Sequence, residues 1–392
     1  MKSTKKIVIM YDFFSENGGL EKVMLFQGKT LKNKGYNVTF AFAFVDDKLK
    51  KEKLSEFKVI EYGKLPIKAE TIQISTSLFR KKILNKFKGT DLIICHSFPA
   101  SYLAYKLKQK FNIPYILHIH HPPKFLYEAD LKWAMNDIKR IFAYFVVKKI
   151  LKKPFRRLDK LCVKNASSHF VASRSVQKRI KDIYGVDGKV IYAPVSNQFK
   201  TINIKHSELA KINNKIQQDF ILSSGRVVKQ KKLDWLIITL SKIKNKELQL
   251  VIAGEYESKI RNELESLSKQ HKVSILFLGK LKQEDLVKLY NCAKVVISIC
   301  PKEGFGLSLA EAIACGTPAI SWKDGSGPEE IIIEGKNGYL AKPYYINDLA
   351  EKIANAVNKK WGKKMLSKSV EKFKEEEIEN VLLTMFADIK ES

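Results

Sequence analysis

Short apolar runs of strand length alternate with amphipathic stretches along the chain. In the first half these runs occupy residues 5–10, 37–44, 57–62, 90–97, 114–120 and 167–173. Helical patterns, such as those over residues 19–34 and 100–110, lie between them. This alternation is typical of βα units, in which parallel strands form a sheet that is covered by helices. The first half is therefore predicted to be a doubly wound α/β domain.

A second series of the same kind follows. Its apolar runs occupy residues 219–225, 248–255, 273–279, 293–300 and 317–322. Pro194 and polar residues follow the strand-like segment KVIYAP and predict a linker near residues 194–204. The chain is thus expected to hold two doubly wound, Rossmann-like domains, over residues 1–197 and 204–366.

The last segment carries a helical pattern of Glu and Lys from about residue 366 to residue 392. The apolar face of this pattern is formed by Ile378, Val381, Leu382 and Met385. We expect a helix over about residues 370–392 that packs back on the N-terminal domain.

The composition is that of a soluble globular chain, with 45% apolar and 29% charged residues. The longest apolar runs, 141–147 and 293–300, fall short of the roughly 20 residues that a membrane-spanning helix needs. Lysines before residues 7–10 resemble the start of a signal peptide, but Asp12 interrupts the apolar stretch and no cleavage site follows. The five cysteines form no C-x-x-C pair, which argues against structural zinc and disulfides. A cytoplasmic protein is predicted.

Positive charge is concentrated in the first half of the chain. The formal net charge is +30; residues 1–200 hold 40 Lys and Arg against 16 Asp and Glu, whereas residues 201–392 hold 31 against 25. Only eight of the 71 basic residues are arginine, so the excess is a diffuse lysine field. Nucleic acid, an acidic membrane surface or a phosphorylated substrate could each be the partner, and a merely solvated lysine surface is the alternative.

The segment over residues 131–161 interleaves large apolar residues with basic ones. Residues 139–160 hold nine Lys and Arg, and Asp159 is their one acid. Such a stretch is typical of an amphipathic element on an anionic lipid surface. An ordinary helix with a lysine-rich polar face explains the pattern equally well.

The strongest chemical signal is PKEGFGLSLAEAIACGTPAIS, residues 301–321, which follows an apolar strand and leads into a helix. If the helix begins around Leu307 or the next residue, Glu311 lies in its first turn and Glu303 lies in the preceding loop. Both carboxylates can then face one cleft beyond the carboxyl end of the strand.

Gly304 and Gly306 in this motif allow the backbone to approach a ligand closely, and the N–H groups of the helix start suit a phosphate. The alternative interpretation is structural: Glu311 interacts with the helix dipole, and the glycines turn the chain.

The motif and its surroundings resemble a known family. EGFGLSLAEA, the following CGTPAI and GSGPEE at 325–330 are similar to the donor site of retaining GT-B glycosyltransferases of family 4. Further similar segments lie in the family's order: NGGLEKV (17–23), HIHHPPKFLYE (118–128), SSGRVVKQKKLD (223–234), LQLVIAGE (248–255) and FLGKL (277–281). The second segment resembles mannosyltransferase-like members, which carry CHEPPR where this chain has IHHPPK. The resemblance implies a GT-B fold, in which two Rossmann-like domains face a cleft.

The resemblance also implies roles for four side chains. Arg226 and Lys231 match the basic pair that binds the donor diphosphate and offsets the charge on the leaving group. Glu311 matches the carboxylate that accepts both ribose hydroxyls, and Glu303 matches the residue that contacts hydroxyls of the donor sugar. The alternative for Arg226 and Lys231 is an ordinary surface pair.

The backbone is implicated at other positions of the resemblance. The amides of Phe305, Gly306 and Leu307, beside Gly304, would lie near the donor sugar, and the backbone of Lys280 would meet the nucleobase. Gly19 would bring the first N-terminal loop to the diphosphate.

His120 matches the family's active-site histidine beside the transferring sugar. A strand would place His118 and His120 on one face and His121 on the other, but no carboxylate or cysteine partner is evident, so no metal site is predicted. The roles of His118, His121 and His96 are left open. The chain has no Asp-x-Asp motif. Catalysis is therefore expected to need neither a divalent ion nor a cofactor.

The predicted function is a retaining, metal-independent hexosyltransferase. Its donor would be a nucleotide sugar of the GDP-mannose or UDP-glucose type, and its acceptor a glycan on a polyprenyl phosphate or diphosphate at the cytoplasmic membrane face. The first alternative is a transferase for a soluble acceptor, of the sucrose- or glycogen-forming kind. The second, a nucleic-acid-binding protein, lacks a zinc finger, an aromatic RNA-binding signature and a basic-leucine pattern. The third alternative is a sugar-nucleotide-binding module without catalytic activity. The presence of all four donor-site side chains argues against it.

Overall fold

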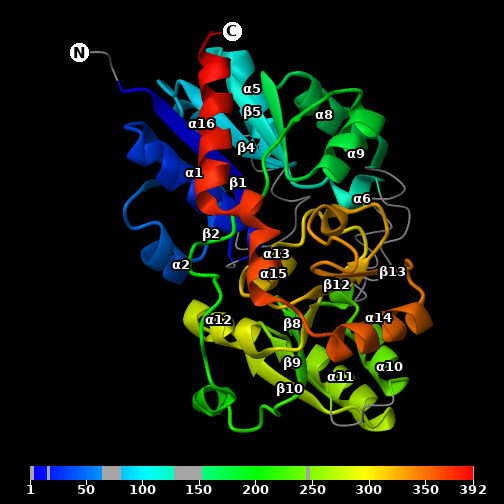
Figure 1. The fold of residues 1–392 in the computed structure, drawn as a ribbon. Coiled ribbons are helices and arrows are strands. Elements are labelled where there is room, and N and C mark those ends of the chain that lie inside the picture. The colour runs from blue at the N-terminus through cyan, green and yellow to red at the C-terminus, as the bar shows by residue number, and fades with distance from the viewer. Residues whose placement is uncertain (1–3, 16–17, 64–80, 128–151, 244–247, 392) are drawn as a thin grey trace. The chain divides into compact units, whose positions relative to one another are not determined.

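The computed structural model describes residues 4–15, 18–63, 81–127, 152–243 and 248–391 (Figure 1). The chain forms two compact units. One comprises Met1–Ala193 and Glu379–Ser392, and the other comprises Pro194–Ile378.

A sheet of parallel strands forms the centre of the first unit. Its strands are β1 (Lys6–Phe14), β2 (Asn37–Val45), β3 (Lys58–Glu61), β4 (Leu92–His96), β5 (Tyr115–Ile119), β6 (Ser168–Val171) and β7 (Lys189–Val190). Their order is β3-β2-β1-β4-β5-β6-β7. The order reverses at β1 and β4, and in doubly wound sheets ligands bind beyond the carboxyl ends of the strands at such a point.

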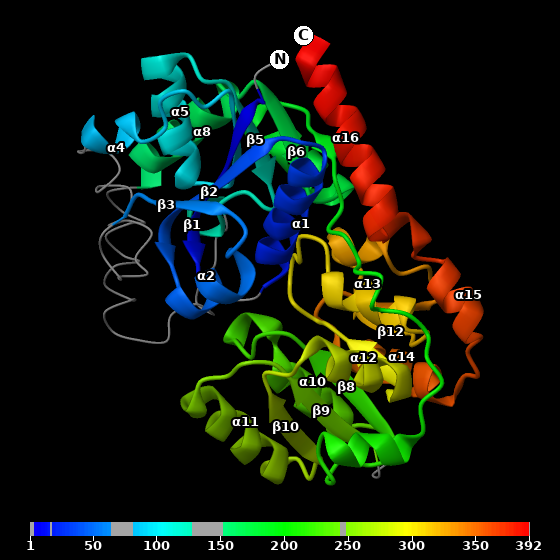
Figure 2. The same cartoon turned by 90° about the vertical axis from the view of Figure 1, so that its left-hand side faces the viewer.

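Helices cover both faces of this sheet (Figure 2). They are α1 (Gly19–Asn33), α2 (Asp47–Lys53), α4 (Lys81–Asn85), α5 (Ala100–Phe111), α6 (Lys124–Tyr127), α8 (Lys152–Lys164) and α9 (Arg174–Tyr184). Because helices lie on both faces, a central strand such as β4 is buried on both sides, which explains its continuous apolar run.

The second unit repeats this design. Its strands are β8 (Phe220–Ser224), β9 (Gln249–Ala253), β10 (Ile275–Gly279), β11 (Val295–Ile297), β12 (Ala319–Trp322) and β13 (Gly338–Ala341), in the order β10-β9-β8-β11-β12-β13. Its helices are α10 (Leu233–Ser241), α11 (Ser258–Gln270), α12 (Gln283–Cys292), α13 (Leu307–Ala314), α14 (Ile346–Asn358) and α15 (Lys363–Lys368). The short 3-10 turns are η3 (His206–Lys211), η4 (Lys229–Lys231), η5 (Gly327–Glu330) and η6 (Glu371–Phe373). The prediction of two doubly wound domains is confirmed.

The C-terminal helix differs from its prediction. Helix α16 spans Glu375–Glu391 and is preceded by the separate elements α15 and η6, so the helical pattern does not run unbroken from residue 366. Val381 is exposed, whereas Leu382 and Phe386 are buried, so the buried stripe is shifted from the predicted one. The helix lies beside β6, where the Phe386 and Phe170 rings are 6.3 Å apart (Figure 2).

Helix α8 is the described part of the basic segment; residues 131–151 lie outside the described residues. Its apolar side chains Phe155 and Leu158 pack against a buried cluster of the first unit rather than facing outward. That cluster consists of Phe98, Tyr102, Leu126 and Cys162. The outward side of α8 carries Lys153, Arg157 and Lys160. Two side chains of the apolar stripe expected to enter lipid thus pack on the core, whereas Leu161 of the same helix is exposed.

Asp159, the one acid of that basic stretch, is buried at the inner side of α8. Its Oδ2 accepts hydrogen bonds from the hydroxyls of Tyr127 and Tyr184, both at 2.7 Å. Burial raises the pKa of Asp159 to about 6, although both hydrogen bonds act to lower it. These bonds fix α8 against α6 and α9.

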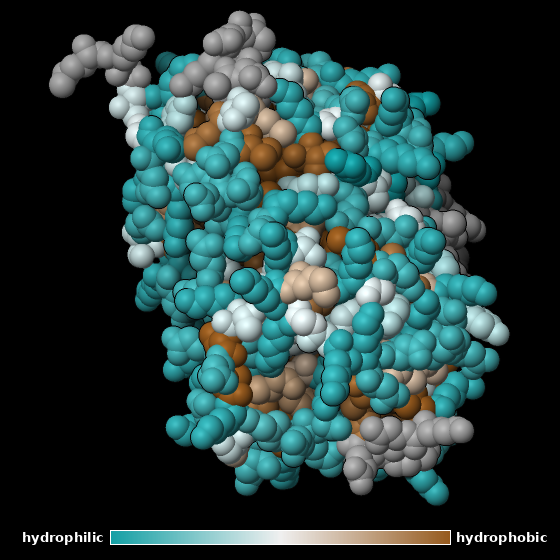
Figure 3. All heavy atoms as spheres, viewed as in Figure 1, coloured by the Kyte–Doolittle hydropathy of each residue, from teal (hydrophilic) through white to brown (hydrophobic). Residues whose placement is uncertain are grey.

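The surface is mostly hydrophilic on the face shown in Figure 3. Among the described residues, the helices are too short or too polar to cross a lipid bilayer.

Candidate functional site

The carboxyl ends of β8, β9 and β11 meet where the strand order of the second sheet reverses. Gly225, directly after β8, has a φ of +116°, and a Cβ at Gly254 would lie 1.9 Å from the Gly225 carbonyl oxygen. Glycine alone allows backbones to approach this closely. The strand ends are therefore held together at the edge where such sheets bind ligands.

Lys231 and Glu303 form an ion pair at this edge, with Nζ 2.8 Å from Oε2. Lys231 ends the turn η4 after β8, and Glu303 lies in the loop after β11. Burial acts to lower the pKa of Lys231, but the charge of Glu303 and the hydrogen bond to it outweigh burial and raise the pKa; nearby Arg226 opposes them. The structure thus brings together three of the predicted residues, and Lys231 is a cation at neutral pH.

The loop that carries Glu303 rests directly on η5. The amide of Gly327 donates a hydrogen bond of 3.0 Å to the Glu303 carbonyl oxygen. A Cβ at Gly327 would lie 2.3 Å from the Phe305 Cα and 2.4 Å from the Gly304 carbonyl oxygen. The Phe305 ring is buried and stands edge-on to Phe373 at 5.1 Å. The GSGPEE segment therefore packs against the backbone of the loop that carries Glu303 and supports it.

Helix α13 begins at Leu307, as expected, after Gly306 with a φ of +99°. Glu311 is its fifth residue and lies beyond the first turn, which holds no acidic residue. The expectation that Glu311 lies in the first turn was therefore wrong: it is the first residue after that turn. Interaction with the helix N-terminus falls off within the first turn, so the helix dipole does not explain a carboxylate at this position.

Glu311 is buried, at 4% exposure, and Tyr290 of α12 holds it in place. The Tyr290 hydroxyl lies 3.3 Å from the Glu311 carboxylate and 2.7 Å from the hydroxyl of Ser224 at the end of β8. Burial, then the Glu311 charge, raises the pKa of Tyr290, so its hydroxyl keeps its proton. The chain from Ser224 through Tyr290 orients the carboxylate beside the same strand end.

Lys280 follows β10 and pairs its Nζ with Glu255 Oε1 at 2.6 Å. Glu255 follows β9, so this exposed pair borders the carboxyl edge of the sheet. The side chain of Lys280 is thereby directed to a neighbouring loop. This is compatible with the expectation that Lys280 meets the nucleobase through its backbone.

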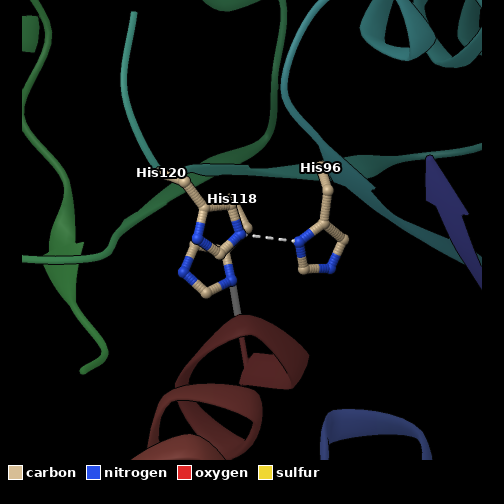
Figure 4. Close-up of side chains that lie close together, drawn as sticks. All are labelled: His96, His118 and His120. Atoms are coloured by element: carbon tan, nitrogen blue, oxygen red, sulfur yellow. Dashed lines mark hydrogen bonds between the residues drawn. The ribbon is translucent and has the colours of Figure 1, made fainter. Parts of the chain in front are cut away.

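In the first unit, Gly19 is the first residue of α1, and His120 follows β5. His120 is not isolated: its Nε2 lies 3.0 Å from Nδ1 of His96, and its ring stacks on His118 with centroids 4.4 Å apart (Figure 4). Burial and neighbouring histidines lower the pKa of His120, so this imidazole is neutral at pH 7.

Two family models together match most of the chain. Residues 205–379 match the model described as glycosyl transferases group 1, and residues 17–198 match the model described as glycosyltransferase family 4. The chain belongs to the group 1, family 4 glycosyltransferases. The family stated from the sequence motifs is confirmed.

This glycosyltransferase is similar to several known proteins. An uncharacterized glycosyltransferase of Methanocaldococcus jannaschii is 26% identical over 73% of this chain and 71% of its own length. Sucrose-phosphate synthase from Thermosynechococcus elongatus has a TM-score of 0.79 and 19% identity, with 98% and 99% of the two chains covered. Anabaena HepE, solved in complex with UDP-glucose, has a TM-score of 0.76 and 17% identity, with 98% and 99% covered. The glycosyltransferase therefore has the GT-B fold.

Sequence reasoning missed Tyr290 and Ser224, which orient Glu311, and it left open the role of His96, which contacts His120. The sequence does carry a signal for His96, because it ends a predicted strand as His118 and His120 do in the next one. The sequence gives no comparable signal for Tyr290, which reads as an apolar position of α12.

Proposed function

We propose that this glycosyltransferase moves a hexose from a nucleoside-diphosphate sugar to an acceptor hydroxyl with retention of anomeric configuration. The observation that carries the proposal is the Lys231–Glu303 pair beside Arg226 at the switch point of the second sheet. Two cations at that edge suit a diphosphate, and the buried carboxylate of Glu311 next to the same strand suits two adjacent ribose hydroxyls.

In this proposal Lys231 and Arg226 offset the negative charge that grows on the diphosphate as the sugar leaves. Glu303 contacts hydroxyls of the sugar, and its ion pair with Lys231 fixes the relative position of sugar contact and phosphate contact. The acceptor attacks from the face that the nucleotide leaves, and the departing phosphate oxygen takes the acceptor proton. The chain then contributes positioning and electrostatic stabilisation rather than a nucleophile.

A panel of GDP-, UDP- and ADP-sugars tests the donor. One nucleotide sugar should raise the melting temperature in the presence of EDTA, because Arg226 and Lys231 take the place of a metal on the diphosphate. Glu311→Ala should weaken that binding by about 10-fold, and Tyr290→Phe by less, since each removes hydrogen bonds worth about 1 kcal/mol. Glu265→Ala, at an exposed ion pair with Arg261 on α11, is the control. Transfer that EDTA abolishes and magnesium restores would contradict metal independence.

The sugar is expected to be mannose or glucose. HIHHPPKFLYE resembles the mannosyltransferase-like members, whereas the HepE neighbour was solved with UDP-glucose. The two donors differ in nucleobase as well as sugar, so competition between GDP and UDP separates the base preference from the sugar preference.

The acceptor is proposed to be a glycan on a polyprenyl phosphate or diphosphate, reached by a first unit that docks on the anionic, cytoplasmic membrane face. The support is the positive charge of residues 1–200 and the outward lysine and arginine side chains of α8. Phe155 and Leu158 pack on the core, so α8 offers the bilayer mainly charge, together with the exposed side chain of Leu161. Each Lys or Arg near such a surface contributes about 1 kcal/mol.

Anionic vesicles should therefore bind the protein at low salt and release it at high salt, because salt screens the attraction. Changing Lys148, Lys149, Lys152 and Lys153 to Glu should lower vesicle binding and transfer to a polyprenyl-linked acceptor, and leave transfer to a short soluble analogue intact. The control, Lys48, Lys51, Lys53 and Lys58 to Glu, makes the same charge change on and beside α2. Equal loss in both sets, or no binding at low salt, would contradict docking through this segment.

A soluble acceptor is the second candidate, favoured by the fold similarity to sucrose-phosphate synthase. Full activity on a water-soluble phosphorylated sugar, without any vesicle binding, would decide for it.

A further inference from the structure

Three histidines converge at the carboxyl ends of β4 and β5 in the first unit (Figure 4). His96 and His118 are direct neighbours in the parallel register, and the two-residue period of a strand places His120 on the same face as His118. The ring centroids lie 4.4 Å apart for His118 and His120, 5.1 Å for His96 and His118, and 5.3 Å for His96 and His120.

The hydrogen bonds of this cluster leave several buried polar atoms unpaired. Nδ1 of His96 and Nε2 of His120 lie 3.0 Å apart, and the amide nitrogen of Gln27 in α1 lies 3.0 Å from Nδ1 of His118. Within the described part of the chain, Nε2 of His118, Nε2 of His96 and Oε1 of Gln27 have no hydrogen-bond partner. A buried polar atom without a partner is costly, and a native structure retains it for a reason.

The chemistry of the cluster matches a late transition metal. Burial lowers the pKa of all three imidazoles, and neighbouring histidines lower it further, so each ring is neutral and offers a lone pair. Neutral imidazole is a preferred ligand of zinc, copper and nickel. With its amide turned so that Oε1 accepts a hydrogen bond from Nδ1–H of His118, Gln27 is the second-shell partner that leaves the lone pair of this ring on Nε2.

We propose that Nδ1 of His96, Nε2 of His118 and Nε2 of His120 bind a divalent late transition metal, with Zn²⁺ as the best match, and leave a fourth position open. At Zn–N distances of about 2.0 Å, two ligands of a tetrahedral ion lie about 3.3 Å apart. The His96–His120 nitrogens already approach that separation, and one ligand atom from each of the three residues lies within 4.8 Å of the others. Small ring rotations complete the site.

The function of the site rests on the proposed transfer reaction and on the role that the family resemblance implies for His120, beside the transferring sugar. A metal ion bound to Nε2 of His120 holds this ring and adds positive charge to it, so the ring can no longer take part in the reaction. Zinc is therefore an inhibitor of transfer, and a chelator restores the activity. This agrees with metal-independent catalysis, because the ion binds to the resting enzyme and supports no step of the reaction.

Equilibrium dialysis of the full chain against Zn²⁺, after treatment with EDTA, tests the site directly. Wild type should retain one ion per chain with micromolar or tighter affinity. Bound Co²⁺ should give the visible absorption of a four-coordinate site, and zinc should abolish it. His96→Asn and His118→Gln should each weaken zinc binding by about 100-fold or more, and Gln27→Met by about 10-fold, since second-shell changes cost 10- to 100-fold. His271→Gln, which removes a histidine of the second unit, should leave affinity unchanged.

The outcomes separate the metal site from the proposed function. The cobalt spectrum needs wild type alone, so the test holds even if a buried histidine variant fails to fold. Absence of a specific ion in wild type, or equal loss in His271→Gln and His96→Asn, overturns the site. Zinc that binds as proposed while transfer continues at full rate upholds the site and instead overturns the role of His120 in the reaction.

Discussion

Lys231→Ala is expected to lower kcat by about 100- to 1,000-fold, the loss typical of removing one group that stabilises charge in the transition state. Lys231 forms an ion pair with Glu303 and lies near Arg226. Because the charge on the diphosphate grows as the sugar departs, the lysine stabilises the transition state more than the bound donor. Single-turnover kinetics with saturating donor would measure the effect, and the KM for the donor should change far less.

Lys229→Ala is the matched control for this variant. Lys229 lies two residues away in η4, is exposed, and is 3.9 Å from Glu263 of α11. Such surface pairs contribute little, so its activity should stay within about two-fold of wild type. Equal rates for Lys231→Ala and Lys229→Ala would contradict the assignment of Lys231 to the donor site.

The Lys231–Glu303 ion pair also predicts how the transfer rate depends on pH. The pKa of Lys231 is raised, so its charge is fully present below its ordinary value and is lost only as pH rises through the higher folded value. An alkaline fall in rate near neutral pH therefore cannot come from Lys231. If a pH–rate profile shows such a limb, the group responsible is another one.

Gly327→Ala should be strongly destabilising and should also abolish transfer. Its Cβ would lie 2.3 Å from the Cα of Phe305 and 2.4 Å from the carbonyl oxygen of Gly304, both of which are backbone atoms that cannot rotate away. Overpacking of this kind costs about 1 to 3 kcal/mol or more. The loop that carries Glu303 must move, so nucleotide-sugar affinity should fall further than the melting temperature alone implies.

Gly362→Ala provides the comparison, because the nearest atoms to its Cβ would be in Met365 at 3.8 Å, an ordinary contact. Thermal unfolding and donor calorimetry on both variants separate a local collision from a general intolerance of alanine. Wild-type melting and donor binding in Gly327→Ala would show that η5 does not support the loop.

Most of the fold follows from strand periodicity, because both sheets are parallel and buried on both faces. Strand β13 was not predicted: it has four residues, Gly338–Ala341, and begins at a glycine whose Cβ would lie 1.9 Å from the Ala319 carbonyl oxygen. Its position depends on a neighbour in the sheet and not on local apolar content, so a pattern along the chain carries little information about it.

The donor-site residues were predictable where they are contiguous in sequence, as in the segment around Glu303 and Glu311. Contacts between distant segments were not. Lys231 and Glu303 are 72 residues apart, and Tyr290 reaches Glu311 only because α12 packs beside α13. The role of His96 stayed open for the same reason: considering β5 alone left His118 and His120 as a pair, and only the register of β4 against β5 places His96 beside them.

The assignment of Glu379–Ser392 to the first unit has a consequence during synthesis. Phe170 meets Phe386 only after the ribosome has translated the whole second unit. At about 5 to 20 residues per second, the nascent first unit waits roughly 10 to 40 s with the surface that α16 covers still open. During that interval the exposed apolar surface is a target for chaperones, and it closes when the residues from Glu379 onward leave the exit tunnel.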